Sequence, residues 1–121
     1  MLVKFVAALP FPPSANGLFS QRRDGRRFPA ARYVAWRKQA DLALMIARRG
    51  ASLGSGPAIV EIELRPPNKR RHDGDNAIKP VLDSLVRMNV LVDDDLKHVR
   101  EIRTRWADGE PGATVVVTWG H

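Results

Sequence analysis

The sequence predicts a single α/β domain of the α+β type, in which one mixed β-sheet carries two packed helices. Three observations predict this class. Residues 30–49 repeat apolar side chains every three or four positions, as an amphipathic helix does. Residues 58–65 alternate apolar and polar side chains, as a half-buried strand does. The length of 121 residues suits one compact domain, so we expect residues 1–121 to form one unit.

The first half of the chain predicts a strand, a loop and a helix. Residues 2–9 are apolar apart from Lys4 and predict the first strand, which ends at a group of prolines. Residues 18–28 are rich in arginine and glycine, so we expect an irregular loop there. The helix over residues 30–49 ends before Gly50, a common stop residue. Its apolar stripe consists of Tyr33, Trp36, Ala40, Leu44 and Ala47.

The second half completes the order β-α-β-α-β-β. After the strand at 58–65 we expect a helix over about residues 76–88, with Ile78, Leu82 and Leu85 buried. Its start is placed late because Pro80 is tolerated only near the beginning of a helix. Residues 98–106 and 113–119 predict the last two strands, joined by a hairpin loop at 108–112.

The composition excludes several classes of protein. The chain has no cysteine, which excludes disulfides, thiolate zinc sites and cysteine nucleophiles. Its apolar runs are too short to cross a bilayer, and its first ten residues lack the pattern of a secretory signal. We therefore expect a cytoplasmic protein with no membrane contact.

The net charge of +7 favours a polyanionic partner, and the basic residues are clustered. Such clusters neutralise phosphates and give salt-sensitive binding to nucleic acid. The alternative is a basic surface that serves only solubility. The residues predicted to bind DNA are Arg22, Arg23, Arg26, Arg27, Lys69, Arg70 and Arg71.

The basic residues form a first cluster at residues 22–27 and a second at residues 69–71, and several acidic residues follow directly after the second cluster. Asp73 and Asp75 flank a glycine, and in an extended segment both carboxylates point the same way. Asp93, Asp94 and Asp95 follow later, and three adjacent like charges are tolerated in a solvated turn or around a cation. Carboxylates suit Mg²⁺, which also takes waters and substrate phosphates as ligands. An ordinary turn and helix start would explain the same residues without a metal.

Lys79 lies four residues after Asp75 and four before Asp83, so all three share one face of a helix. Its ammonium could stabilise charge at a scissile phosphate. The alternative is an exposed ion pair, for which Asp83 is the natural partner. His72 is a further candidate base, although a phosphate contact suits it better beside Arg71. The three histidines lack the spacing of a zinc motif, and no Ser-His-Asp triad or P-loop is recognisable.

Three segments of the sequence form a recognisable pattern: LPFPPSAN at residues 9–16, RRHDGDNAIKPVLDSL at residues 70–85 and VDDD at residues 92–95. In these segments the chain resembles the RusA family of Holliday junction resolvases, which are common in prophages. The resemblance implies a homodimeric, Mg²⁺-dependent endodeoxyribonuclease of DNA recombination and repair that nicks two opposed strands of a four-way junction. The implied metal ligands are Asp73, Asp75 and Asp94, with Lys79 as the essential cation. Gly74, His72 and the third acid of the VDDD segment depart from the family pattern.

The predicted reaction is in-line attack of a metal-bound water on a phosphodiester. Two alternative functions belong to other classes of protein. The first is a non-catalytic module that binds branched DNA or RNA and needs no Mg²⁺. The second is a structural protein whose basic surface meets an acidic protein partner. In the first alternative the acids only cap a helix and a turn. The paired acids, the lysine and the later acids, in the order of that family, favour the enzyme over both alternatives.

Overall fold

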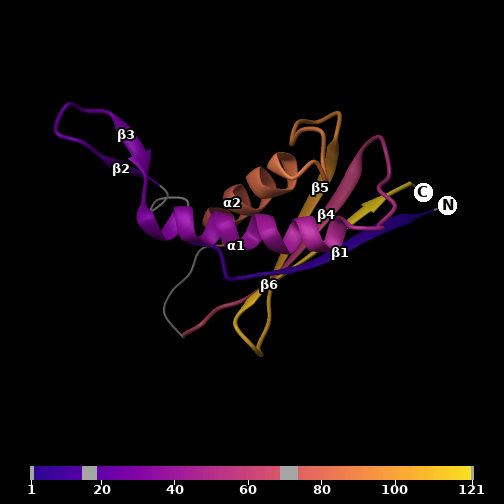
Figure 1. The fold of residues 1–121 in the computed structure, drawn as a ribbon. Helices are drawn as coiled ribbons and strands as arrows, with labels where there is room; N and C mark the ends of the chain where they lie inside the picture. The colour runs from indigo at the N-terminus through magenta and orange to yellow at the C-terminus, as the bar shows by residue number, and fades with distance from the viewer. Residues whose placement is uncertain (1, 15–18, 69–73, 121) are drawn as a thin grey trace.

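The computed structural model describes residues 2–14, 19–68 and 74–120, with the backbone alone of residues 74–76. Within these ranges a four-stranded mixed sheet is covered on one face by two helices, and a two-stranded hairpin stands apart from it (Figure 1). The predicted fold class is confirmed. No helix in the described ranges is both long enough and apolar enough to cross a membrane.

The predicted order β-α-β-α-β-β is found, with an additional hairpin before the first helix. The strands of the main sheet are β1 (Val3–Leu9), β4 (Ala58–Arg65), β5 (Val99–Trp106) and β6 (Gly112–Trp119). The hairpin and the helices are β2 (Phe19–Gln21), β3 (Arg27–Pro29), α1 (Ala31–Arg48) and α2 (Gly74–Arg87). The hairpin corrects the expected irregular loop, because its short strands pair across a turn that backbone hydrogen bonds close.

The strand order in the main sheet is β1-β6-β4-β5. β6 runs antiparallel to both neighbours, whereas β4 and β5 are parallel and are joined through α2. The expected hairpin between β5 and β6 is therefore wrong, since β4 lies between them. The physical reason is burial: Val115 and Val117 of β6 are fully buried at the centre, while the charged β5 forms an edge that tolerates solvent.

The core lies between the sheet and the helices. Val60, Ile62 and Leu64 of β4 face the helices and are almost completely buried, as their alternation predicts. From α1, Trp36 packs into this core and its indole Nε1 donates a hydrogen bond to the carbonyl of Pro10 at 2.9 Å. This bond ties the end of the first strand segment to the helix, so the proline-rich stretch is positioned by the core.

α2 begins earlier than predicted, at Gly74, and it contains Pro80 in its interior. Proline has no N–H to offer the carbonyl four residues back, so the first turn of α2 is held by fewer hydrogen bonds. Pro80, Val81 and Leu85 are all fully buried, and burial of apolar surface offsets that loss. The late start was therefore a wrong prediction, because packing outweighs local helix propensity here.

Asp41 joins the two helices through three short hydrogen bonds. Its carboxylate accepts from Ser84 Oγ at 2.7 Å and from Arg87 Nε and Nη2 at 2.8 Å each. Burial alone would raise the pKa of Asp41, but the hydrogen bonds and the charge of Arg87 outweigh it and hold this pKa below its usual value. The ionised form of Asp41 therefore stabilises the fold.

We expect Asp41→Asn to lower the free energy of unfolding at pH 7 by about 2 kcal/mol, the usual loss for hydrogen bonds to a charged group. A carboxyl whose pKa is depressed by folding contributes stability above its unfolded pKa, and this is lost as the pH falls through the folded pKa. The difference in the free energy of unfolding between Asp41→Asn and the unsubstituted protein should therefore shrink below about pH 4. Urea unfolding from pH 7 down to about pH 2 measures it, with Asp108→Asn on the exposed β5–β6 loop as the control. A difference independent of pH would contradict the assignment.

Candidate functional site

The candidate site is centred on the start of α2, shortly after β4 ends. Lys69, Arg70, Arg71, His72 and Asp73 lie outside the described residues, and so does the side chain of Asp75. The backbone of Asp75 belongs to the first turn of α2. The predicted convergence of Asp73 and Asp75 therefore stays a prediction, whereas the position of Asp75 at the beginning of a helix is observed.

Lys79 lies one helical turn after Asp75, on the surface of α2. Its side chain is 62% exposed, and its Nζ lies 3.4 Å from Asp83 Oδ2. The expected partnership of Lys79 with Asp83 is confirmed. An exposed pair at this spacing adds little to stability, so the ammonium is available to a ligand at the surface.

The acidic segment 93–95 lies in the connection between α2 and β5. The backbone N–H groups of Val90 and Leu91 both donate to the carbonyl of Leu85, which holds the chain against the last turns of α2. At its other end the carbonyl of Asp95 accepts from the N–H of Val99, the first residue of β5. The acids are thus positioned at the carboxyl end of α2.

The three carboxylates of this segment differ in their hydrogen bonds. Asp93 Oδ1 accepts from the backbone N–H of Asp94 at 2.8 Å. Asp95 Oδ1 accepts from the N–H of Lys97 at 3.2 Å and lies 2.6 Å from His98 Nδ1. The hydrogen bond to His98 holds the pKa of Asp95 below its usual value. Asp94 is exposed, and its carboxylate accepts no hydrogen bond from any residue that the structure describes, so its lone pairs are open to a ligand.

Asp94 and Asp75 are placed at opposite ends of α2. This helix has 14 residues. At a rise of about 1.5 Å per residue it is about 20 Å long. Among the described side chains no group of three acids or histidines is close enough to hold a metal ion. One copy of the chain therefore does not bring Asp94 beside the start of α2.

The first basic cluster lies on the β2–β3 hairpin, where Arg22, Arg23, Arg26 and Arg27 are all exposed. The nearest acid, Asp24, accepts a hydrogen bond from the N–H of Arg26 and lies 3.8 Å from its guanidinium. Phe19 and Phe28, which flank this cluster in the sequence, were not among the predicted site residues. Aromatic residues interleaved with arginines are a recognisable signal for nucleic-acid binding.

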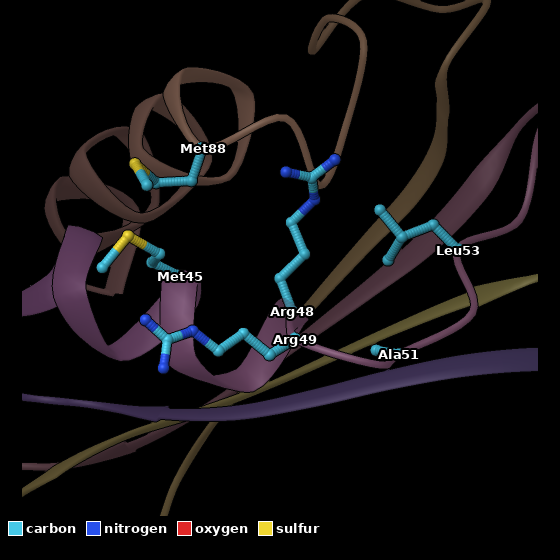
Figure 2. A pocket seen from close by; sticks show the side chains of 6 residues that line it. All are labelled: Met45, Arg48, Arg49, Ala51, Leu53 and Met88. Carbon is cyan, nitrogen blue, oxygen red and sulfur yellow. The ribbon is translucent and has the colours of Figure 1, made fainter.

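A pocket of about 270 Å³ lies away from these residues, between the carboxyl ends of the two helices. Figure 2 shows Arg48 and Arg49 extending in different directions from the end of α1, with Met45 and Met88 on the facing sides of α1 and α2. Ala51 and Leu53 complete its lining, which contains no carboxylate. This pocket is not suited to hold a divalent metal ion.

Comparisons with known proteins match nearly the whole chain to one family. Residues 10–118 match the family model described as endodeoxyribonuclease RusA. The crossover junction endodeoxyribonuclease RusA of Escherichia coli strain K12 is 33% identical over 87 residues, which cover 71% of this chain and 70% of that protein. The protein of the same name from Shigella sonnei strain Ss046 is 33% identical over 86 residues, with the same coverage. The span matched to the family model contains Asp73, Asp75, Lys79 and Asp94.

Proposed function

The chain belongs to the RusA family of endodeoxyribonucleases and is a nuclease, and from this premise we propose that it resolves Holliday junctions by paired, symmetric nicks. The observation that carries the proposal is the family match over residues 10–118, which includes all four predicted catalytic residues. The structure adds two supporting features. Lys79 is exposed one turn into α2, and Asp94 has a carboxylate open to a ligand.

The proposed metal ligands are Asp73, Asp75 and Asp94, and the proposed ion is Mg²⁺. Three carboxylates are a donor set of the kind that hard divalent cations prefer. Asp94 fits this role better than its two neighbours, because their oxygens already accept hydrogen bonds. When bound, the ion would lower the pKa of an attacking water and polarise the phosphodiester.

Lys79 is proposed to bind the scissile phosphate. Its position one turn after Asp75 places both residues on one face of α2. A fixed ammonium there would stabilise the negative charge that grows on the phosphate oxygens during attack. Asp83 would hold the lysine in place through the ion pair at 3.4 Å until DNA displaces it.

A homodimer would supply what one chain lacks. The length of α2 separates Asp94 from Asp75 within a single chain, so we assign the third carboxylate of each site to Asp94 of the partner subunit. A two-fold dimer presents equivalent surfaces to equivalent strands, which suits two nicks in a symmetric four-way junction. Cutting would then require the assembled dimer, because neither subunit holds a complete site.

The basic residues are proposed to hold the DNA backbone. The hairpin arginines are exposed and outnumber the single acid beside them. Together with the net charge of +7, they would give affinity that falls steeply with salt. The residues assigned to this role are Arg22, Arg23, Arg26, Arg27, Lys69, Arg70 and Arg71.

A synthetic four-way junction with end-labelled strands tests the proposed function directly. With Mg²⁺ we expect paired nicks in two opposed strands on a denaturing gel, and with excess EDTA we expect binding without cutting. A linear duplex of the same sequence, which should stay intact, is the control. Salt-sensitive binding with no cleavage in any divalent metal would instead support a non-catalytic module.

A further inference from the structure

The β2–β3 hairpin is an ordered element with no part in the buried core. Three antiparallel residue pairs, from Phe19↔Pro29 to Gln21↔Arg27, join its strands. Its turn is closed by the N–H of Arg22 on the carbonyl of Arg26 at 2.8 Å, and Gly25 provides the positive φ of +85°. The hairpin projects from one end of the molecule (Figure 1). A projecting ribbon of this kind can enter a partner without disturbing the fold.

Each face of the hairpin carries one arginine over one phenylalanine. Residues that pair across two strands share a face, and so do residues two apart, so Phe19 and Arg27 lie on the same face. The guanidinium carbon of Arg27 lies 5.0 Å from the ring centroid of Phe19. On the other face, the guanidinium carbon of Arg22 lies 5.4 Å from the ring centroid of Phe28. Both distances suit a cation–π contact.

The Phe19 face is anchored to the body of the protein. The Phe19 ring meets Tyr33 edge to face at a centroid distance of 6.1 Å, and Tyr33 stacks on Trp36 at 6.4 Å. Tyr33 and Trp36 are both buried. This aromatic column fixes the base of the hairpin on α1. The Phe28 face lies on the opposite side of the hairpin from the column. The Phe28 ring itself is half-buried and the Phe19 ring is 41% exposed, but the Arg22 guanidinium over Phe28 is exposed, so a base can stack there without displacing the contacts that anchor the hairpin.

The hairpin projects from the end of the molecule at which the candidate site begins. Ser84 of α2 contacts Asp41 of α1, and Met88 lines the same pocket as Met45. Met45 lies four residues after Asp41 in α1, and Met88 lies four residues after Ser84 in the α2 segment. Because moving four residues forward on each segment keeps the two in contact, α1 and α2 run side by side in the same direction. Figure 1 shows both helices starting on the side from which the hairpin extends. A DNA bound at the start of α2 would therefore lie within the hairpin's neighbourhood.

We infer that the hairpin binds unstacked nucleobases at the branch point, stacking them on its arginine–phenylalanine pairs, with Phe28 and Arg22 as the principal platform. This inference rests on the proposed function. Bases stack readily on aromatic rings and on guanidinium planes once they have left the duplex. A guanidinium already lying over a ring is ordered before binding, so less side-chain freedom is lost when the base arrives.

Phosphate binding alone would not require this arrangement. Arg23 and Arg26 would serve a phosphate backbone without any aromatic neighbour, and a continuous duplex leaves no base face open for Phe28. At a junction the base pairs next to the crossover can open and expose such faces. The hairpin would therefore bind branched DNA in preference to linear DNA, whereas arginines alone would bind both equally.

Binding in excess EDTA tests the inference without cleavage. The probes are a four-way junction with 2-aminopurine beside the crossover, the same junction with 2-aminopurine in one arm, and a linear duplex. We expect the unsubstituted protein to change the fluorescence of the crossover probe and not that of the arm probe. Phe28→Leu should remove this change and weaken junction binding about tenfold, the order expected for one lost base–aromatic stack, while duplex binding stays the same.

Arg23→Gln is the matched control in the same hairpin, because Arg23 has no ring beneath it in the part of the chain described. It should weaken binding to junction and duplex equally. The slope of the logarithm of the binding constant against the logarithm of the salt concentration should fall in magnitude by about one, the value for one lost phosphate contact, and the fluorescence change should remain. Phe19→Leu provides a second aromatic variant, with thermal unfolding to confirm that each variant is folded.

These measurements distinguish failure of the proposed function from failure of the hairpin inference. An unsubstituted protein that binds junction and duplex equally would contradict the proposed function itself. A protein that prefers the junction, but whose Phe28→Leu and Phe19→Leu variants keep both the preference and the fluorescence change, would overturn the hairpin inference alone. Equal weakening of junction and duplex by Phe28→Leu would overturn it as well, because a stacking platform acts only on open bases.

Discussion

Asp73→Asn is expected to abolish nicking of a four-way junction while leaving junction binding unchanged or tighter. The substitution removes a proposed metal ligand, and it removes one negative charge from the site proposed to bind the DNA backbone. A bound divalent ion supplies several kcal/mol to phosphoryl transfer, so the rate should fall about a thousandfold or more. Binding improves because the repulsion between the carboxylate and the DNA backbone is removed.

Single-turnover cleavage and filter binding on the same junction measure the two effects separately. Asp108→Asn makes the same chemical change on the exposed loop between β5 and β6, and it should leave both quantities as they are. Full cleavage by Asp73→Asn would refute the assignment of this residue. A parallel loss of cleavage and binding would point to damaged folding, which thermal unfolding would reveal.

Mixing two inactive variants should restore cleavage if each site is shared between subunits. Asp75→Asn and Asp94→Asn should each be inactive alone. A heterodimer of the two would combine the intact Asp75 of one subunit with Asp94 of the partner subunit, giving one working site. With random exchange, half of the dimers are mixed and each has one working site in two, so about a quarter of the sites should cut. The product should be a single nick and not a paired one.

The control mixes Asp73→Asn with Asp75→Asn. These two acids are two residues apart in the sequence and are assigned to the same subunit's half of each site, so a heterodimer of these variants has no complete site and should stay inactive. Denaturing gels of the pre-mixed proteins report the cleavage in both experiments. An inactive mixture of Asp75→Asn and Asp94→Asn would show that Asp94 acts within its own chain, and that the acidic segment must move towards the start of α2.

The spacing of apolar residues predicted most helices and strands correctly, because it depends directly on which face of each element is buried. The alternation in residues 58–65 and the stripe from Tyr33 to Leu44 matched the observed buried faces. Lys79 and Asp83 were paired correctly, because the spacing of a helix alone brings them together. These features depend on neighbours within a few residues of one another.

The wrong predictions concern relations that local patterns do not contain. The β2–β3 hairpin looked like a loop because its strands are three residues long and its charges obscure any alternation. The position of β6 between β1 and β4 follows from competition among all strands for the buried centre of the sheet. Pro80 is accepted inside α2 because tertiary burial outweighs the lost hydrogen bond.

The sequence by itself determined the fold class, the clustering of the acids and the family resemblance, since these depend on residue type and spacing. Only the tertiary structure decided where those residues lie. It placed the acidic segment at the far end of α2 from Asp75, and it put the hairpin at the end where α2 begins. Spacing along a chain limits how far apart two residues can be, whereas the packing of helices on the sheet decides whether they meet.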